Sequence, residues 1–191
     1  MKSIIFATGN QRKIKEANRM LDSFGVVVEP RVVEIDEIQH HDPIEITKAK
    51  ALAAYKAIQE PVVVSDTSWS ISALDGFPGG YMKDVAMWFD EKDWLAIMER
   101  HEDKRIFCYE HVAYFDGEEL THFSTTYEGY FVDEPRGKIV ENESFQRVIE
   151  LYGDNDKTMG EMYNNGTSSE GTELGHWKQF GEWFAGKTLG L

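Results

Sequence analysis

Cysteine is almost absent from this sequence of 191 residues, because Cys108 is its only one. A single cysteine cannot form a disulfide within the chain, which is typical of proteins kept in a reducing compartment. No apolar run approaches the roughly 18 to 20 residues of a membrane-spanning helix. The first residues also lack the apolar stretch and the cleavage site of a secretory signal. We therefore expect a soluble, cytoplasmic protein that does not enter a membrane.

Cations are also scarce, since 20 Lys and Arg residues stand against 34 Asp and Glu residues, a formal net charge of −14. Such a chain is not expected to bind nucleic acid or an anionic membrane. The simplest interpretation of the acidity is solubility. A small polyanion could still bind in a local basic pocket, and a phosphorylated ligand would then arrive with a divalent cation.

Strand-like and helix-like patterns alternate at both ends of the chain, with a hairpin between them. The predicted elements are strands at residues 3–8, 26–35 (broken at Pro30), 61–67 and 68–74, helices at 11–23, 42–60, 92–100 and 173–186, and a hairpin at 105–131 that reverses at Asp116-Gly117. Residues 132–172 favour loop. This order predicts an α/β fold with a mixed central sheet and flanking helices. We expect one domain, 1–191, whose two lobes enclose a cleft.

The first stretch that could carry chemistry joins the first strand to the first helix and reads Thr8-Gly9-Asn10, followed by Lys13. Free backbone N–H groups at the positive end of a helix bind phosphate well. Glycine lets a ligand approach the backbone, and Lys13 lies one turn into the helix, where its ammonium group can reach back. An ordinary helix cap formed by Thr8 or Asn10, with solvated cations, explains the same pattern.

Carboxylates mark two further stretches. Asp66 ends a predicted buried strand, where open α/β sheets place ligand-binding groups, although a turn cap would look the same. The run from Glu34 to Lys50 is rich in acids, which usually indicates a solvated face. Magnesium, however, binds carboxylate oxygens together with water and substrate phosphates. His40-His41 is a weaker candidate for a transition-metal site, because adjacent histidines point in different directions.

Taken in order, these stretches resemble the inosine triphosphate pyrophosphatase (Ham1-like) family. The resemblance is carried by the TGNxxK pattern at residues 8–13, ExxxxKA at 45–51, the strand ending in Asp66-Thr67, and ALDGFPGGY at 73–81. Members of this family hydrolyse nucleoside triphosphates to the monophosphate and pyrophosphate with Mg²⁺, and they clear non-standard purine nucleotides from the pool. The resemblance implies the same reaction and the family's two-lobed fold here.

The resemblance also assigns roles to individual residues. Thr8, Gly9, Asn10, Lys13 and Lys50 would bind the triphosphate. Asp66 matches the catalytic acid that accepts a proton from the attacking water, Thr67 matches the small hydroxylic residue beside it, and Glu37 with Asp66 would hold Mg²⁺. Many relatives have a second acid where this chain has Ser65.

The part of the family pattern that reads the base is largely replaced. Phe145 stands where the stacking phenylalanine is expected and His176 is retained, and both are assigned to substrate binding. The family's aspartate is missing after Phe145, where Gln146, Arg147 and Val148 follow, and Gly175 and Trp177 replace a serine and an arginine. We therefore predict an altered base preference, because hydrogen-bonding groups in the pocket set discrimination.

Four aromatic or imidazole side chains could stack on a base. They are Trp69, Phe145, His176 and Trp177. Core packing explains the aromatic residues equally well.

Other functions remain open. One is a nucleotide-binding module with weak or lost turnover, and another is a phosphatase of a different phosphorylated metabolite. The family also implies a homodimer, for which residues 76–89 offer an apolar contact surface.

Overall fold

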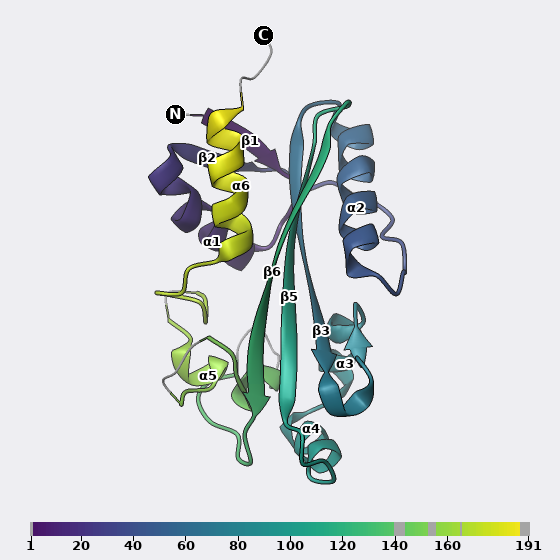
Figure 1. The fold of residues 1–191 in the computed structure, drawn as a ribbon, viewed down its shortest axis with the longest axis vertical. Coiled ribbons are helices and arrows are strands. Elements are labelled where there is room, and N and C mark those ends of the chain that lie inside the picture. The colour runs from purple at the N-terminus through teal and green to yellow at the C-terminus, as the bar shows by residue number, and fades with distance from the viewer. Residues whose placement is uncertain (1, 140–143, 153–155, 165, 188–191) are drawn as a thin grey trace. The chain divides into compact units, whose positions relative to one another are not determined.

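The computed structural model describes residues 2–139, 144–152, 156–164 and 166–187. Its main elements are labelled in Figure 1 and are β1 Lys2–Phe6, α1 Gln11–Leu21, β2 Val26–Pro30, α2 Pro43–Ile58, β3 Val62–Ile71, β4 Pro78–Gly79, α3 Met82–Trp88, α4 Glu91–Met98, β5 Arg105–Phe115, β6 Leu120–Phe131, β7 Ile149–Glu150, α5 Met159–Met162 and α6 Gly175–Gly186. The strand order is β2-β1-β3-β5-β6-β7, with β4 beside β3. β1 runs parallel to β2 and β3, whereas β4 and β7 pair antiparallel, so the predicted mixed α/β fold is confirmed.

The chain divides into two compact units. The first comprises Met1–Asp66, Glu110–Thr125 and Glu173–Leu191, and the second comprises Thr67–Tyr109 and Thr126–Thr172. β3, β5 and β6 each begin in one unit and end in the other. The predicted cleft between two lobes stays a prediction.

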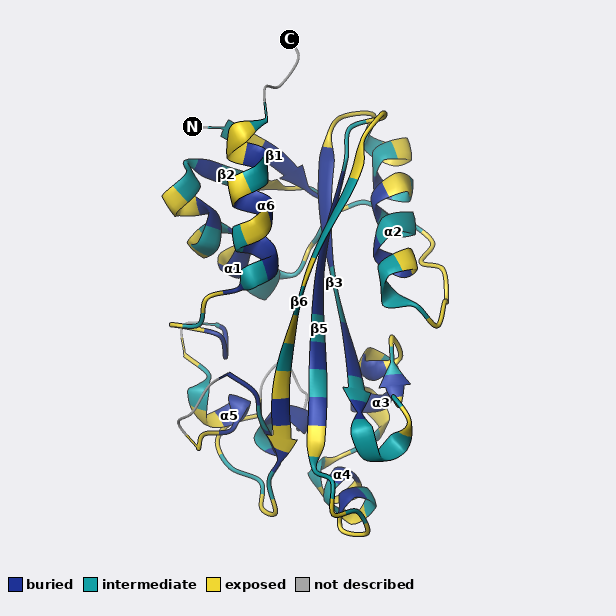
Figure 2. Ribbon diagram, in the orientation of Figure 1, coloured by how far each residue is buried: buried dark blue, intermediate teal, exposed yellow. Residues whose placement is uncertain are grey.

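Helices cover both faces of the sheet in the first unit. Ala51 and Ala54 of α2 pack against one face, together with Ile5, Val62, Val64 and Ala113. On the other side α1 and α6 lie next to each other (Figure 1), and Trp177 of α6 meets Phe6 edge to face at 5.1 Å between ring centroids. Burial is concentrated in β1, β3 and β5 (Figure 2), as expected for strands covered by helices.

The second unit has an aromatic core of its own. Trp94 of α4 is fully buried and lies 5.1 Å from Phe145 and 6.2 Å from Phe131, measured between ring centroids. Trp69 of β3 meets Phe145 edge to face at 5.1 Å. Large aromatic side chains therefore provide much of the buried apolar area that stabilises this unit.

The predicted helices begin at side-chain caps. Asn10 Oδ1 accepts from the backbone N–H of Lys13 at 3.1 Å, and Asp42 Oδ1 accepts from that of Ile44 at 2.9 Å, with Pro43 in the first turn. Asp90 and Asp93 form a capping box at the start of α4, one residue earlier than predicted. These residues satisfy N–H groups that the helix itself leaves unpaired.

The structure differs from the sequence prediction in four segments. The strand predicted at residues 26–35 ends at Pro30, and residues 31–35 are not in a strand. Residues 61–74 form one strand of 10 residues, β3, followed by a short 3-10 turn, where two strands were expected. Residues 82–88 form α3, which was not predicted. The expected loop at 132–172 contains β7, α5 and a 3-10 turn over Phe145–Arg147.

Among the described residues, none of the helices is long and apolar enough to cross a membrane.

Candidate active site

The loop from β1 into α1 forms the N-terminal, positive end of the helix dipole. Thr8 Oγ1 accepts from the backbone N–H of Asn10 at 3.1 Å, and Asn10 caps the helix, so both side chains act as local caps. Gly9 is exposed, and a Cβ added there would come within 3.3 Å of Val32 Cγ2. The first turn of α1 holds no acidic residue. The loop therefore supplies backbone donors and a positive dipole end without a carboxylate of its own.

Lys13 extends from α1 to the middle of β3. Its Nζ donates to the carbonyl oxygen of Ser65 at 3.3 Å. Burial lowers the pKa of Lys13, while the nearby Asp66 carboxylate acts to raise it, and Lys50 lowers it further. The Lys13 Nζ therefore lies beside the strand position of Asp66, and its role as a phosphate contact stays a prediction.

Lys50 of α2 joins the two predicted carboxylates. Its Nζ lies 2.5 Å from Glu37 Oε1 and 3.8 Å from Asp66 Oδ1. The Lys50 side chain is 16% exposed, whereas those of Glu37 and Asp66 are 49% and 25% exposed. The structure thus brings together four predicted site residues from three distant segments, Lys13, Glu37, Lys50 and Asp66.

The predicted base-binding residues of the second unit take part in packing. Phe145 is 2% exposed and Trp69 is 9% exposed, and they pack against each other. Arg147 forms an ion pair with Glu91 of α4 at 2.7 Å. Thr67 is half-buried on β3, next along the chain from Asp66. In this arrangement the Phe145 ring serves the core, and its role in stacking on a base stays a prediction.

His176 and Trp177 occupy the first turn of α6 in the first unit. Trp177 is 2% exposed and packs between Phe6 and Phe180, so its ring is a core side chain. His176 is also 2% exposed, and its Nδ1 finds no hydrogen-bond partner in the part of the chain that the structure describes. Burial, with contributions from Lys13 and His111, lowers the pKa of His176 to about 3.

Two titratable residues near Lys13 and Asp66, and a third that contacts one of them, were not identified from the sequence. Glu110 and His111 of β5 are buried, and His122 of β6 is partly buried. Besides burial, the Glu110 carboxylate is among the charges that act on the pKa of Lys13, which it raises. Besides burial and His122, Asp66 acts to raise the pKa of His111 and Lys13 acts to lower it. A signal was available, because charged and imidazole side chains interrupt an otherwise apolar strand at residues 106–115.

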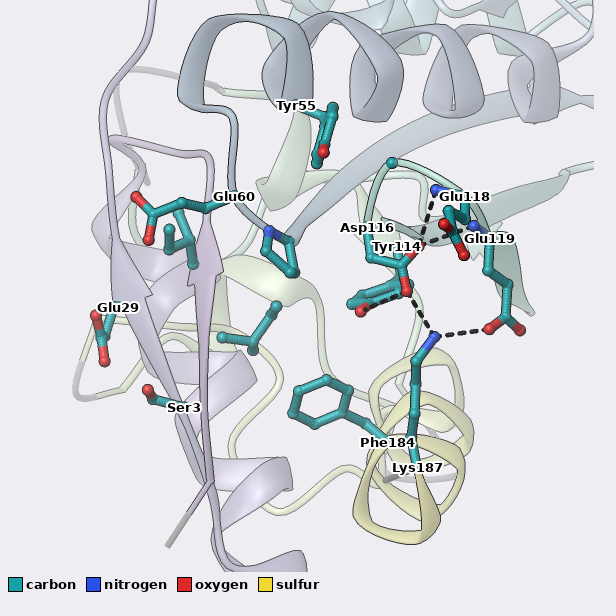
Figure 3. A pocket seen from close by; sticks show the side chains of 14 residues that line it. Ser3, Glu29, Tyr55, Glu60, Tyr114, Asp116, Glu118, Glu119, Phe184 and Lys187 are labelled. Carbon is teal, nitrogen blue, oxygen red and sulfur yellow. Dashed lines mark hydrogen bonds and ion pairs between the residues drawn. The ribbon is translucent and has the colours of Figure 1, made fainter. Parts of the chain in front are cut away.

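A pocket of about 860 Å³ in the first unit contains none of the predicted site residues (Figure 3). Its lining includes Tyr55, Tyr114, Asp116, Glu119 and Lys187. Lys187 spans part of it, because its Nζ binds Asp116 Oδ2 at 2.9 Å and Glu119 Oε2 at 2.6 Å, the dashed contacts in the figure. The charges that line the pocket therefore already satisfy one another in part.

Known proteins resemble this chain in sequence and in fold. The sequence matches the Ham1 family over residues 4–170. A dITP/XTP pyrophosphatase of Hyperthermus butylicus is 33% identical over 134 residues, which cover 70% of each chain. One of Methanosarcina acetivorans is 28% identical over 98% of this chain and its own full length. The structure of a HAM1 protein from Coxiella burnetii has a TM-score of 0.78 at 20% identity, covering 98% of this chain and 100% of its own, which shows the fold. This chain belongs to the Ham1 family.

Proposed function

We propose that this protein hydrolyses a nucleoside triphosphate to its monophosphate and pyrophosphate. The observation that supports this most strongly is the cluster in which Lys50 contacts Glu37 and Asp66 while Lys13 reaches the neighbouring carbonyl of Ser65. Two cations and two carboxylates suit a site that must attract a polyanion and also activate water. Relatives that span this region carry the name dITP/XTP pyrophosphatase, which fits the same reaction.

The charged side chains of this cluster each have a role in the proposed reaction. A triphosphate resists attack since its oxygens repel the incoming nucleophile, and Lys13 and Lys50 would spread that charge. Asp66 accepts a proton from water as the water oxygen bonds to the phosphorus of the first phosphate. The bridging P–O bond to the second phosphate breaks, and pyrophosphate leaves with the electron pair.

We propose Mg²⁺ as the cofactor, held by Glu37 and Asp66. Bound there, the ion would supply a positive charge that binds the triphosphate oxygens. No group of three or more histidine, cysteine or acidic side chains in the described residues is arranged to hold a metal ion. Two partly exposed carboxylates fit magnesium, which commonly takes one or two carboxylates and completes its shell with water and substrate phosphates.

The base preference is proposed to differ from the family pattern. His176 and Phe145 remain candidates for substrate contacts, with Thr67 beside the catalytic acid. Arg147, however, is committed to Glu91, and Trp177 to the core around Phe6. Arg147 and Trp177 therefore do not take over the roles of the lost aspartate and arginine, which supports a changed base preference.

We also propose that the protein is a cytoplasmic homodimer that acts on the nucleotide pool. Four large apolar side chains are exposed within residues 76–89, namely Phe77, Tyr81, Met87 and Trp88. Met87 and Trp88 are 67% and 74% exposed. An apolar patch of this kind suits an interface between two copies of the chain.

The test is pyrophosphate release from a panel of purine and pyrimidine triphosphates, with and without Mg²⁺. We expect turnover of at least one triphosphate, abolished by a chelator and restored by Mg²⁺. Asp66→Asn keeps the side-chain shape and removes the base, so turnover should fall by about 100-fold or more in a variant that still folds. Asp133→Asn, at an exposed position after β6, is the matched control and should leave turnover unchanged.

The panel also distinguishes the other candidate functions. Binding of triphosphates without release of pyrophosphate would indicate a nucleotide-binding module. Release of inorganic phosphate from other phosphorylated metabolites, with no action on triphosphates, would indicate a phosphatase. Unaltered turnover of Asp66→Asn would rule out Asp66 as the base.

A further inference from the structure

Two histidines face each other across the β5–β6 hairpin. His111 Nδ1 lies 3.2 Å from His122 Nε2, and the ring centroids are 5.3 Å apart. His111 lies five residues before Asp116, and His122 lies five residues after Gly117. Because the hairpin turns at Asp116-Gly117, its register places the two histidines opposite each other. One ring nitrogen must donate to the other, because a hydrogen bond between two imidazoles needs one donor and one acceptor.

The strand pattern places His111 on the same face of the sheet as Asp66. Ala113 and Val64 both pack in the cluster formed with Ala51 and Ala54 of α2. Side chains two residues apart on a strand share a face, so His111 on β5 and Asp66 on β3 also turn toward the α2 side. β3 and β5 are neighbours in the sheet, and Asp66 is among the charges that act on His111.

The second ring nitrogen of His111 is buried without a partner. His111 is 3% exposed, and no described residue makes a hydrogen bond to its Nε2. Buried polar groups without a hydrogen-bond partner are rare in native proteins, and each one calls for an explanation. Burial and His122 lower the pKa of His111 to about 4, so the ring is neutral at pH 7.

We propose that His111 Nε2–H binds a phosphate oxygen of the substrate, and that His122 is the positioning residue that fixes the required tautomer. This inference rests on the proposed function. The ionised oxygens of a triphosphate only accept hydrogen bonds, so His111 must present a donor at Nε2. Its Nδ1 must then accept, and His122 Nε2–H is placed to donate to it at 3.2 Å.

A neutral hydrogen-bond donor suits this site better than a third cation would. Lys13 and Lys50 already supply two positive charges near Asp66. A third cation would repel both lysines and would weaken the basicity of the carboxylate. A neutral imidazole adds a directed hydrogen bond to the anion without changing the net charge of the site.

The test is calorimetric binding of inorganic tripolyphosphate in Mg²⁺ buffer, which does not depend on turnover. His111→Phe keeps a ring of similar size and removes both nitrogens, so affinity should fall by about tenfold. His122→Phe should also weaken binding, whereas His122→Gln retains an N–H that can donate to His111 and should restore much of it. His101→Phe, in the second unit, is the matched control and should leave the affinity unchanged.

A spectroscopic measurement separates this role from a purely structural one. In ¹⁵N NMR of the wild type, His111 should show a proton on Nε2 and an accepting Nδ1, and the Nε2–H signal should shift when tripolyphosphate binds. A merely structural histidine pair would leave that signal unmoved by the ligand. Loss of the signal in His111→Phe assigns it.

Each result decides between the two proposals. If the wild type releases no pyrophosphate but His111→Phe weakens tripolyphosphate binding and the Nε2–H signal shifts, the proposed reaction fails and the role of His111 stands. If the wild type turns over triphosphates but His111→Phe binds tripolyphosphate as tightly, the role of His111 fails. A wild type that binds no tripolyphosphate also overturns it.

Discussion

His176 shows how burial alters the chemistry of a single side chain. It is 2% exposed on α6, and the charges that act on it come from Lys13 and His111. Its folded pKa of about 3 lies below the roughly 6.5 of an unfolded histidine. As the pH falls below about 6.5, the unfolded chain takes up the proton first, so folded-state stability is present above that pH and is lost toward pH 3.

We therefore expect His176 to contribute to acid sensitivity. Between pH 7 and pH 5 the wild type should lose about 2 kcal/mol more stability than His176→Phe, at about 1.4 kcal/mol for each pH unit below 6.5. The measurement is urea unfolding of both proteins at the two pH values. An equal pH dependence in the two proteins would show that His176 can ionise freely in the fold.

At the scale of elements, the last turn of α6 is fixed by two lysines. Lys2 Nζ on β1 donates to the carbonyl oxygens of Phe184, Ala185 and Lys187 at the end of the helix. The Lys187 side chain binds Asp116 and Glu119 in the turn of the β5–β6 hairpin, and its ammonium lies 4.6 Å from the ring centroid of Tyr114. Although burial acts to lower it, these hydrogen bonds raise the pKa of Lys187.

Lys187→Met should destabilise the first unit, because it removes the charge that satisfies two carboxylates and keeps most of the side-chain volume. We expect a melting temperature lower by about 3 °C. Lys178→Met is the control, since its ion pair with Glu173 lies on an exposed face of the same helix, with side chains 41% and 64% exposed. Equal melting temperatures for Lys187→Met and the wild type would show that this network contributes little.

At the scale of the whole molecule, the second unit displays the apolar patch on which the proposed dimer rests. Burying Trp88, at 74% exposed, would remove a large aromatic surface from water. A glutamate there would have to be desolvated on association, which is unfavourable. A single substitution at Trp88 is therefore expected to change the oligomeric state.

We expect the wild type to sediment at about twice the 21.9 kDa of one chain. Trp88→Glu should sediment as a monomer with an unchanged far-ultraviolet circular dichroism spectrum. Leu52→Glu, at an exposed apolar position on α2, should remain a dimer. A monomeric wild type, or a dimeric Trp88→Glu, would contradict the proposed interface.

The sequence by itself determined the local features of this protein. The starts of α1 and α2 were readable because Asn10 and Asp42 cap the helices that directly follow them. The hairpin followed from period-two alternation about Asp116-Gly117, and the TGNxxK pattern with Asp66 pointed to the family that the comparisons confirm. Such signals depend on neighbours in the chain, so they require no knowledge of the tertiary structure.

Only the tertiary structure decided which distant side chains meet. That Lys50 bridges Glu37 and Asp66, and that His111 lies among the charges of this site, depends on α2 packing over β3 and β5. It also decided that Phe145 and Trp177 are buried, since an aromatic residue looks the same in the sequence whether it stacks on a base or on another ring. Burial and long-range pairing arise from strand order and helix placement, which no local pattern specifies.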